Sequence, residues 1–266
     1  MAVDYPNRIV CLTEETTEAL YLMGEESRLV GISGYTVRPA RARKEKPKVS
    51  AFTSAKIDKI LNLQPDLVLG FSDMQADICS ELVRAGIEVH IFNQRSIDEI
   101  FRMLQTLGSL IGKPEKANML IEKLAENLSD IRELVKNLDK RPKVYFEEWY
   151  DPYICGIRWV SELIDLAGGI DCFAEQAKNS LGKDRIIADD SAIIKANPDI
   201  IIGSWCGRKF KAERVKERPG WEAINAVKND NLFEVKSADI LQPGPACLSD
   251  GVRQLHQIVT DWAHRN

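Results

Sequence analysis

The chain has 266 residues, of which 44% are apolar, and its formal net charge at pH 7 is -4. A chain of this length can bury a large core and often forms two compact lobes. The acidic balance excludes a general nucleic-acid binder, because such domains are usually strongly basic. We therefore expect no nucleic-acid partner.

Apolar runs in the chain are far shorter than the roughly 20 residues that a membrane-spanning helix needs, so no membrane insertion is expected. The N-terminus, MAVDYPNRIVCL, lacks the basic end, apolar centre and small-residue cleavage site of a secretory signal. As it stands, the sequence predicts a cytoplasmic monomer. If a signal segment has been removed, a periplasmic or lipid-anchored protein is expected.

Short runs rich in Val and Ile recur along the chain, and each is followed by a segment with helical periodicity. Such alternation predicts parallel sheets covered by helices, an α/β fold. The runs are residues 8–12, 28–32, 66–71, 89–92, 143–149, 199–205 and 232–236.

A basic run, RPARARKEKPK, occupies Arg38 to Lys48 and carries six basic residues and one acidic residue. Exposed charges need no partner, so a solvated loop explains it. Contact with a partner, or with anionic groups of a ligand, is the alternative.

Apolar residues advance by three or four from Pro114 to Leu138, which predicts one long helix. Proline suits its first turn, and Pro142 lies just past its end. We interpret this helix as a connection between two lobes. The predicted division is an N-terminal α/β lobe at residues 1–113, a connecting helix at 114–140 and a C-terminal α/β lobe at 141–266.

Two stretches nearly repeat each other: QPDLVLGF ends at Phe71, and NPDIIIGSW ends at Trp205. In each, a helix is expected to end before the proline, and an aspartate opens a buried strand. Open α/β sheets bind ligands beyond the carboxyl ends of their strands. Phe71 and Trp205 are therefore predicted to border one ligand cleft between the lobes, unless the repeat is only a common α/β joint.

Motifs of catalysis are missing from the sequence, which has no G-x-S-x-G, H-E-x-x-H or G-x-G-x-x-G segment. Glu147 and Glu148 are adjacent in a predicted strand and point to opposite faces, so they cannot form one acid/base pair. His90 lies in an apolar run and is interpreted as a core residue. We expect no catalytic residue, no catalytic cofactor and no metal site.

Six cysteines are scattered without a C-x-x-C pair, so neither a zinc cluster nor a redox dithiol is expected. Most of them are interpreted as buried free thiols. They are Cys11, Cys79, Cys155, Cys172, Cys206 and Cys247.

The segment YFEEWYDPYICGIRW, from Tyr145 to Trp159, concentrates aromatic residues just beyond a predicted strand. Aromatic residues mixed with arginines suit a large, flat ligand with polar edges better than they suit covalent chemistry. Some of the rings belong to the core. Trp149, Tyr150 and Tyr153 surround an Asp-Pro turn, and at least one of them is expected in a ligand site.

Several segments resemble the helical-backbone (class III) substrate-binding proteins, in particular the cobalamin-binding proteins of vitamin uptake systems and their siderophore and haem relatives. The N-terminal likeness lies in RIVCLTEETTEALYLMGEESRLVGISGY and KVSAFTSAKIDKILNLQPDLVLGF. The C-terminal likeness lies in VSELIDLAGG, RPGWEAINAVKNDNLFEV and LQPGP. The resemblance implies two Rossmann-like lobes joined by a single long helix, with the ligand in a cleft between them.

Site residues follow from the resemblance and from loop position. Aromatic residues would cover the apolar face of a corrin, and polar residues would meet its amide edge. The predicted ligand-binding residues are Tyr35, Phe52, Phe71, Glu148, Trp149, Tyr153, Arg158, Arg185, Trp205, Asp239 and Gln242.

An ABC permease is the partner that the resemblance implies, since transporter-dependent members present a glutamate on each lobe to arginines of the permease. The corresponding positions here are Asp58 and Ser191, with Asp189 and Asp190 beside Ser191. This departure weakens the prediction of docking.

Three hypotheses result. The first is non-catalytic binding of cobalamin or a related corrinoid, a small-molecule metal chelate. The second is a ferric-siderophore or haem carrier of an ABC uptake system. The third is an enzyme that acts on a corrinoid or chelate, with Cys206 as a reactive thiol or cobalt ligand.

Overall fold

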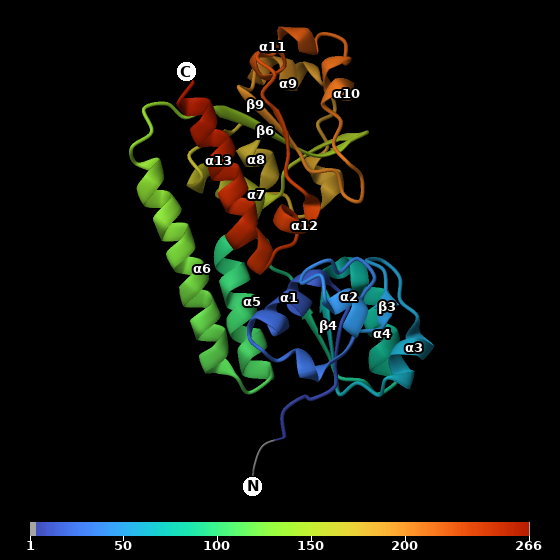
Figure 1. Cartoon of the computed structure of the whole chain (residues 1–266). Helices are drawn as coiled ribbons and strands as arrows, with labels where there is room; N and C mark the ends of the chain where they lie inside the picture. The colour runs from blue at the N-terminus through green and yellow to red at the C-terminus, as the bar shows by residue number, and fades with distance from the viewer. Residues whose placement is uncertain (1–3, 266) are drawn as a thin grey trace. The chain divides into compact units, whose positions relative to one another are not determined.

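The computed structural model describes residues 4–265, which form two compact units. The N-terminal unit contains the chain up to Gln94 and Asp98–Lys123. The C-terminal unit contains Arg95–Ile97 and the chain from Leu124 onward. Each unit has a largely parallel sheet with helices packed on it, which confirms the predicted α/β class (Figure 1).

The sheet of the N-terminal unit is wholly parallel, with the strand order β3-β2-β1-β4-β5. From β1 the chain adds β2 and then β3 on one side of β1, and it then returns to add β4 and β5 on the other side. Open α/β sheets bind ligands beyond the carboxyl ends of their strands at such a reversal, here at β1 and β4. The strands are β1 (Ile9–Cys11), β2 (Leu29–Ser33), β3 (Lys48–Ser50), β4 (Leu67–Phe71) and β5 (Val89–Phe92). The helices up to the connecting helix are α1 (Glu14–Leu22), α2 (Ala42–Glu45), α3 (Ile57–Asn62), α4 (Ala76–Arg84) and α5 (Ile97–Leu110).

The sheet of the C-terminal unit is built around β6 (Lys143–Tyr150). Strands β9 and β10 lie on one side of it and are parallel to it. On its other side, β8 pairs with its beginning in parallel and β7 pairs with its end in antiparallel orientation. The remaining strands are β7 (Tyr153–Cys155), β8 (Ile170–Asp171), β9 (Ile200–Gly203) and β10 (Leu232–Glu234). The helices are α7 (Arg158–Leu166), α8 (Ala174–Ala177), α9 (Ser191–Ala196), α10 (Ala212–Lys216), α11 (Asn225–Lys228), α12 (Ser237–Ile240) and α13 (Val252–Ala263).

The seven predicted strands are all present, with ends that differ by a residue or two. Strands β3, β7 and β8 were not predicted, and they are only two or three residues long. Strands β1 and β10 are as short, but each lies within a longer run rich in apolar residues, at residues 8–12 and 232–236, that marks it in the sequence.

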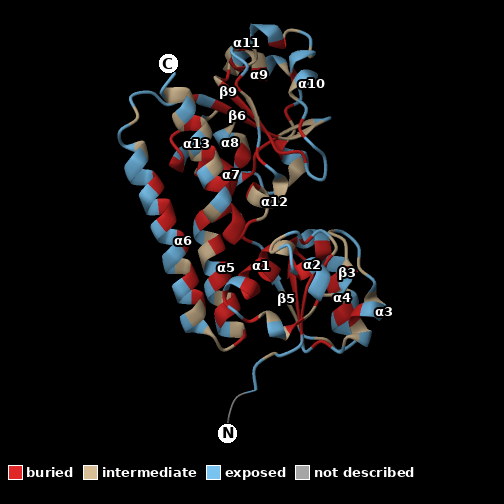
Figure 2. Ribbon diagram, viewed as in Figure 1, coloured by how far each residue is buried: buried red, intermediate tan, exposed pale blue. Residues whose placement is uncertain are grey.

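The predicted long helix is α6 (Pro114–Val135), which has 22 residues and ends one turn earlier than expected. It begins in the N-terminal unit and continues into the C-terminal unit. Figure 2 shows that buried and exposed residues alternate around it. Its buried positions are Ala117, Leu120, Leu124, Leu128 and Ile131. Within the C-terminal unit, Asn127 donates to the carbonyl of Leu248 at 2.8 Å and accepts from Arg253 at 2.6 Å, which ties α6 to α13 and the turn before it.

The repeated phrase forms the same joint in each unit. Gln64 and Asn197 leave the preceding helix with positive φ angles of 48° and 46°. The next aspartate then caps the neighbouring strand: Asp66 accepts from the backbone N–H groups of residues 7 and 8, at 2.7 and 2.9 Å, just before β1. Asp199 accepts from the N–H of Lys143, at the start of β6, at 2.9 Å. The repeat therefore fastens β4 to β1 and β9 to β6.

The glycine of each phrase allows another side chain to lie against the strand. A Cβ atom at Gly70 would come within 2.8 Å of Ile91 and 3.0 Å of Gln75. At Gly203 it would overlap the ring of Phe210, which is buried in the core of the C-terminal unit. Any larger residue therefore displaces packed atoms.

Gly203→Ala is expected to destabilise the protein by about 1–3 kcal/mol, because the Phe210 ring has no free space to enter. Denaturant unfolding measures this change. Gly182→Ala is the control, since its added carbon would meet nothing closer than 3.9 Å. Combining Gly203→Ala with Phe210→Leu should make the glycine change less costly than it is alone. Equal stability of Gly203→Ala and the wild type would contradict the overlap.

Candidate functional site

The carboxyl ends of β6 and β9 form the centre of a candidate ligand site. These neighbouring parallel strands lie where the chain reverses its order across the sheet, since β8 and β9 flank β6 on opposite sides. Such a reversal is where open α/β sheets bind ligands. Strand β6 ends in Trp149 and Tyr150, and Trp205 follows β9 by two residues.

A fully buried carboxylate lies beneath this edge. Glu147, on β6, has a side chain that is 0% exposed. Arg218 donates one hydrogen bond to each of its oxygens, at 2.6 and 2.9 Å, and Trp205 Nε1 donates at 2.9 Å. The Tyr145 hydroxyl donates at 3.3 Å. A bidentate arginine–carboxylate pair is among the strongest hydrogen-bonded arrangements, so Glu147 fixes the positions of Trp205 and Arg218.

Burial and charge hold these groups in defined protonation states. Burial, reinforced by the negative charge of Glu147, keeps the pKa of Tyr145 well above its ordinary value, so the hydroxyl remains a donor. Burial opposes the charge of Arg218, but its hydrogen bonds and attraction to Glu147 outweigh burial and raise its pKa. Arg218 therefore stays charged.

Aromatic rings pack side by side above this carboxylate. The ring centroid of Trp205 lies 4.4 Å from that of Tyr150 and 5.1 Å from that of Phe210. Tyr150 in turn lies 5.0 Å from Trp149. These distances are typical of attractive aromatic pairs, and the planes of neighbouring rings are tilted by 31° to 66°, so the rings form one packed cluster.

Three arginines from the segment after β9 lie over the rings. The guanidinium carbon of Arg218 is 4.8 Å from the centroid of Tyr153, and that of Arg214 is 5.3 Å from Tyr150. Arg208 lies 5.6 Å from Trp149 and donates to the Tyr150 hydroxyl at 2.6 Å. A guanidinium over an aromatic face is attracted by the ring's electrons.

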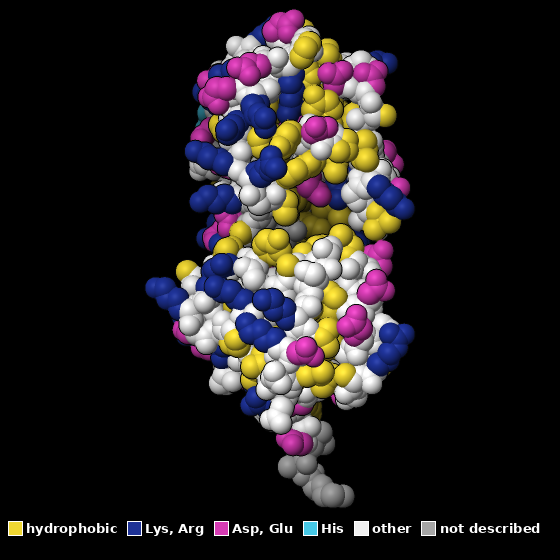
Figure 3. Space-filling model, turned by 90° about the vertical axis from the view of Figure 1, so that its right-hand side faces the viewer, with side chains coloured by type: hydrophobic (Ala, Val, Ile, Leu, Met, Phe, Trp, Pro, Cys, Tyr) yellow, Lys and Arg dark blue, Asp and Glu magenta, His cyan; other side chains and the backbone are white. Residues whose placement is uncertain are grey.

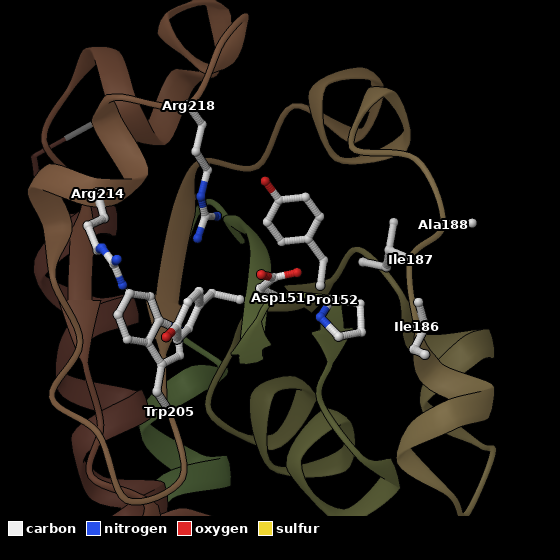
Figure 4. A pocket seen from close by; sticks show the side chains of 10 residues that line it. Asp151, Pro152, Ile186, Ile187, Ala188, Trp205, Arg214 and Arg218 are labelled. Atoms are coloured by element: carbon white, nitrogen blue, oxygen red, sulfur yellow. The ribbon is translucent and has the colours of Figure 1, made fainter.

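A cavity of about 460 Å³ opens between these groups and the loop before α9. Figure 4 shows Arg214 and Trp205 on one side and Ile186, Ile187 and Ala188 on the other. Its volume lies in the range of small-molecule pockets. The lining residues are Tyr150, Asp151, Pro152, Tyr153, Ile186, Ile187, Ala188, Trp205, Arg214 and Arg218.

Two predicted polar contacts, Glu148 and Arg185, bind each other. Arg185 is only 3% exposed and donates to both oxygens of Glu148, at 2.6 and 3.0 Å. It also donates to the carbonyl of Cys155 at 2.5 Å. Glu147 and Glu148 thus hold separate arginines, as expected for adjacent strand residues that point to opposite faces. A ligand role for Glu148 and Arg185 stays a prediction.

Three other predicted polar residues, and the predicted Trp149, lie outside the lining of this cavity. Arg158 begins α7 and forms an ion pair with Glu162 at 2.8 Å. Asp239, on α12, accepts from Gln254 at 3.2 Å, and Gln242 follows α12 and is half-buried. Their predicted ligand contacts stay predictions.

The predicted aromatics of the N-terminal unit lie at one edge of its sheet. Tyr35 and Phe52 each follow a strand by two residues, and Phe71 ends β4. Tyr35 is 57% exposed and Phe71 is 6% exposed. Trp149, Tyr153 and Trp205 come together in the C-terminal unit in the same way, whereas a shared cleft between the two groups stays a prediction.

Gln75 connects the loops that carry two of these rings. Its side chain is fully buried: Nε2 donates to the carbonyls of Phe52, at 2.9 Å, and Leu12, at 3.4 Å, while Oε1 accepts from the N–H of Phe71 at 2.9 Å. One amide therefore joins the ends of β1, β3 and β4.

The basic run at residues 38–48 is only partly a solvated loop, because it contains α2. Arg43 donates to the carbonyls of Gly34 and Thr36, each at 2.8 Å, and so holds the turn that presents Tyr35. Arg38 forms an ion pair with Glu18 at 2.8 Å. Figure 3 shows Lys and Arg side chains grouped on the visible face of the N-terminal unit.

The predicted docking positions are both exposed. Asp58 lies in the first turn of α3, and Ser191 is the first residue of α9. The N–H and hydroxyl of Ser191 donate to Asp189, and these bonds lower the pKa of Asp189. An ionised carboxylate is therefore present beside Ser191.

Within residues 4–265, no group of three or more His, Cys, Asp or Glu side chains is placed to hold a metal ion. Four of the six cysteines are buried, Cys172 is half-buried and Cys206 is exposed. Burial raises the pKa of Cys11, Cys155 and Cys172 to about 12, so these three are unreactive thiols. No helix in the described part of the chain is long and apolar enough to span a bilayer.

Comparison with known proteins identifies the class. Residues 9–238 match the family model of periplasmic binding proteins, and the chain belongs to this family. This confirms the family predicted from the sequence.

Particular relatives refine the comparison. The chain is 30% identical over 268 residues to the ABC transporter substrate-binding lipoprotein YvrC of Bacillus subtilis (strain 168), covering 96% of this chain and 80% of the relative. It is 24% identical over 262 residues to a vitamin B12-binding protein of Vibrio cholerae, covering 96% and 90%. The solved haem-binding protein RhuT from Roseiflexus sp. RS-1 has the same fold, with a TM-score of 0.82, 20% identity and coverage of 97% and 99%.

Several residues of the site were not predicted. Glu147 was considered only as a member of an acid/base pair, and Arg214, Arg218 and Gln75 were not singled out. A buried polar residue at the end of a strand is a recognisable signal for Glu147. The partners of Gln75 are backbone groups far away in the sequence, and no pattern of residue types reveals them.

Arg218→Met is expected to reduce the free energy of unfolding by about 3–5 kcal/mol, because it leaves the buried Glu147 carboxylate without its cation. Adding Glu147→Gln to this variant should recover much of the loss, since the uncompensated charge is then gone. Lys136→Met is the control, because its ion pair with Glu133 is exposed. Urea unfolding followed by tryptophan fluorescence measures all three; equal losses in Arg218→Met and the control would refute a structural role for the pair.

Gln75→Leu should destabilise the protein by about 2 kcal/mol or more, because buried backbone groups at Phe52 and Phe71 lose their partners. Gln105→Leu, at an exposed position of α5, serves as the control. Hydrogen exchange at the Phe71 amide should accelerate in Gln75→Leu and not in the control. Unchanged protection of that amide would count against the role assigned to Gln75.

Proposed function

We propose that this protein is a non-catalytic binding protein for cobalamin or a related corrinoid. The observation that carries the proposal is the cavity in the C-terminal unit, where tilted aromatic rings in mutual contact lie over a buried carboxylate and beneath arginines. This arrangement provides a surface for stacking with charged groups at its edge.

A corrin fits such a surface chemically. It is a large ring with apolar faces and a fringe of carboxamides, each of which needs both a donor and an acceptor. Arg214 supplies donors at the cavity and Asp151 supplies an acceptor. Each buried ring can contribute about 1.5–3 kcal/mol through burial of apolar area.

The relatives support this ligand class and also supply the second candidate. A vitamin B12-binding protein is similar over nearly the whole chain. A haem-binding protein shares the fold, and arginines over a flat cavity also suit the carboxylates of haem or a ferric siderophore. A metal chelate with a large organic ligand is common to both candidates.

Delivery to an ABC permease forms part of the proposal. The likeness to a substrate-binding lipoprotein of an ABC transporter supports it and favours work outside the cytoplasmic membrane. Asp58 on one unit and Ser191 with Asp189 on the other are the proposed contacts with the permease.

An enzyme that uses Cys206 is the less favoured alternative. Cys206 is exposed next to Trp205, but metal-ligating side chains do not gather around it in the described chain. The proposed role needs no chemical change of the ligand.

Titration of the purified protein with cyanocobalamin and, separately, with haemin tests the proposal. We expect saturable binding of cyanocobalamin at micromolar concentrations or below, which corresponds to about -8 kcal/mol or better. Calorimetry and the visible spectrum measure it, and the spectrum afterwards shows whether the ligand is unaltered. If haemin alone saturates the protein, the second candidate replaces the first.

Tyr153→Ala is expected to weaken binding of the preferred chelate about tenfold, because it removes one ring that lines the cavity. It is a better test than Trp205→Ala, which would also take a donor from the buried Glu147. Tyr5→Ala, at an exposed position near the start of the described chain, is the matched control. Equal affinities of both variants would show that the ligand does not enter this cavity.

A further inference from the structure

The segment from Arg208 to Arg218 is strongly basic although the whole chain is acidic. It contains six basic residues and two acidic ones. Two of its cations are neutralised within the unit, because Arg218 is paired with Glu147 and Lys216 with Asp230 at 2.7 Å. The fold therefore leaves an excess of positive charge beside the cavity.

Two of the remaining cations converge on one ring. The guanidinium carbons of Arg208 and Arg214 lie 6.0 and 5.3 Å from the centroid of Tyr150. Both arginines are exposed, and the described structure shows no carboxylate partner for either. Two like charges held near one ring repel each other, and a bound anion would relieve this repulsion.

The acidic groups nearby do not remove the excess. Glu147 is committed to Arg218 beneath the rings, and Glu213 and Glu217 are exposed on and after α10. Asp151 lines the cavity, but no ion pair joins it to either arginine in the described chain. It is a carboxylate of the cavity lining that would oppose an incoming anion, and the charge of Asp190 also acts on Tyr153 of that lining.

We propose that Arg208 and Arg214 form an oxyanion subsite that binds a phosphodiester or carboxylate at the edge of the ligand. This inference rests on the proposed function, because it assumes that the chelate enters the cavity. The planar guanidinium of arginine suits both groups, since it can donate two parallel hydrogen bonds to two oxygens. Tyr150 holds Arg208 in place through the hydrogen bond from Arg208 to its hydroxyl.

Three probes distinguish the sources of the anion. Cyanocobalamin carries a phosphodiester in its nucleotide loop, whereas cobinamide has the same corrin ring and lacks that loop. Haemin carries two carboxylates. Affinities of the full chain for each are measured by calorimetry at low and at physiological salt.

Arg214→Gln is expected to weaken binding of cyanocobalamin about fivefold and to leave cobinamide unchanged. The effect should shrink at higher salt, because ions screen exposed charges. Lys228→Gln is the control: it removes the same charge from the exposed end of α11, outside the cavity lining. A loss for haemin alone would still support the subsite and assign it to carboxylates.

Asp151→Asn is a second variant. It should strengthen binding of the anionic probe, because it removes an opposing charge. A misfolded protein would bind more weakly, so such a gain in affinity cannot result from misfolding. Two results would overturn the subsite while chelate binding stands. In the first, Arg214→Gln changes the affinity for no probe more than the control does. In the second, it weakens binding of cobinamide as much as binding of cyanocobalamin and leaves haemin binding unchanged. If the wild type binds none of the three probes saturably, the proposed function is overturned as well.

Discussion

The buried carboxylate of Glu147 is the constraint on which the candidate site depends. A charge removed from water is costly unless it is paired and hydrogen-bonded, and Glu147 satisfies this requirement with Arg218, Trp205 and Tyr145. Trp205 follows β9, Arg218 follows α10, and Tyr145 lies on β6 itself. One ionised group thus fixes the orientation of the indole and the guanidinium that line the cavity, so the surface is formed before any ligand arrives.

In the N-terminal unit, the side chain that joins the strand ends is a neutral amide and not a carboxylate. Gln75 has donors and an acceptor on one side chain, and it joins backbone groups at the ends of three strands. A neutral amide suits backbone partners, which carry no net charge, whereas a carboxylate suits an arginine. Each unit therefore places aromatic residues at its strand ends, but the buried polar group that organises them differs.

Local sequence patterns predicted the α/β class, seven of the ten strands of the described chain, the long helix and the repeated joint, because each of these is encoded by residues close together in the chain. The same patterns placed Trp149, Tyr153 and Trp205 at strand ends. They could not show that Glu148 and Arg185 bind each other, or that Arg218 reaches Glu147 across 71 residues. Such pairs depend on the path of the folded chain.

Net charge also proved a poor guide to the surface that a ligand would meet. The chain as a whole carries -4, yet the segment beside the cavity is basic and two of its arginines lie over one tyrosine ring. Screening limits an exposed charge to an influence of about 8–10 Å at ordinary salt, so a ligand in the cavity responds to these arginines and to Asp151 rather than to the net charge of the whole chain. The selectivity of such a site is therefore set by the balance among a few nearby charges, and a single substitution at Arg214 or Asp151 is enough to shift that balance.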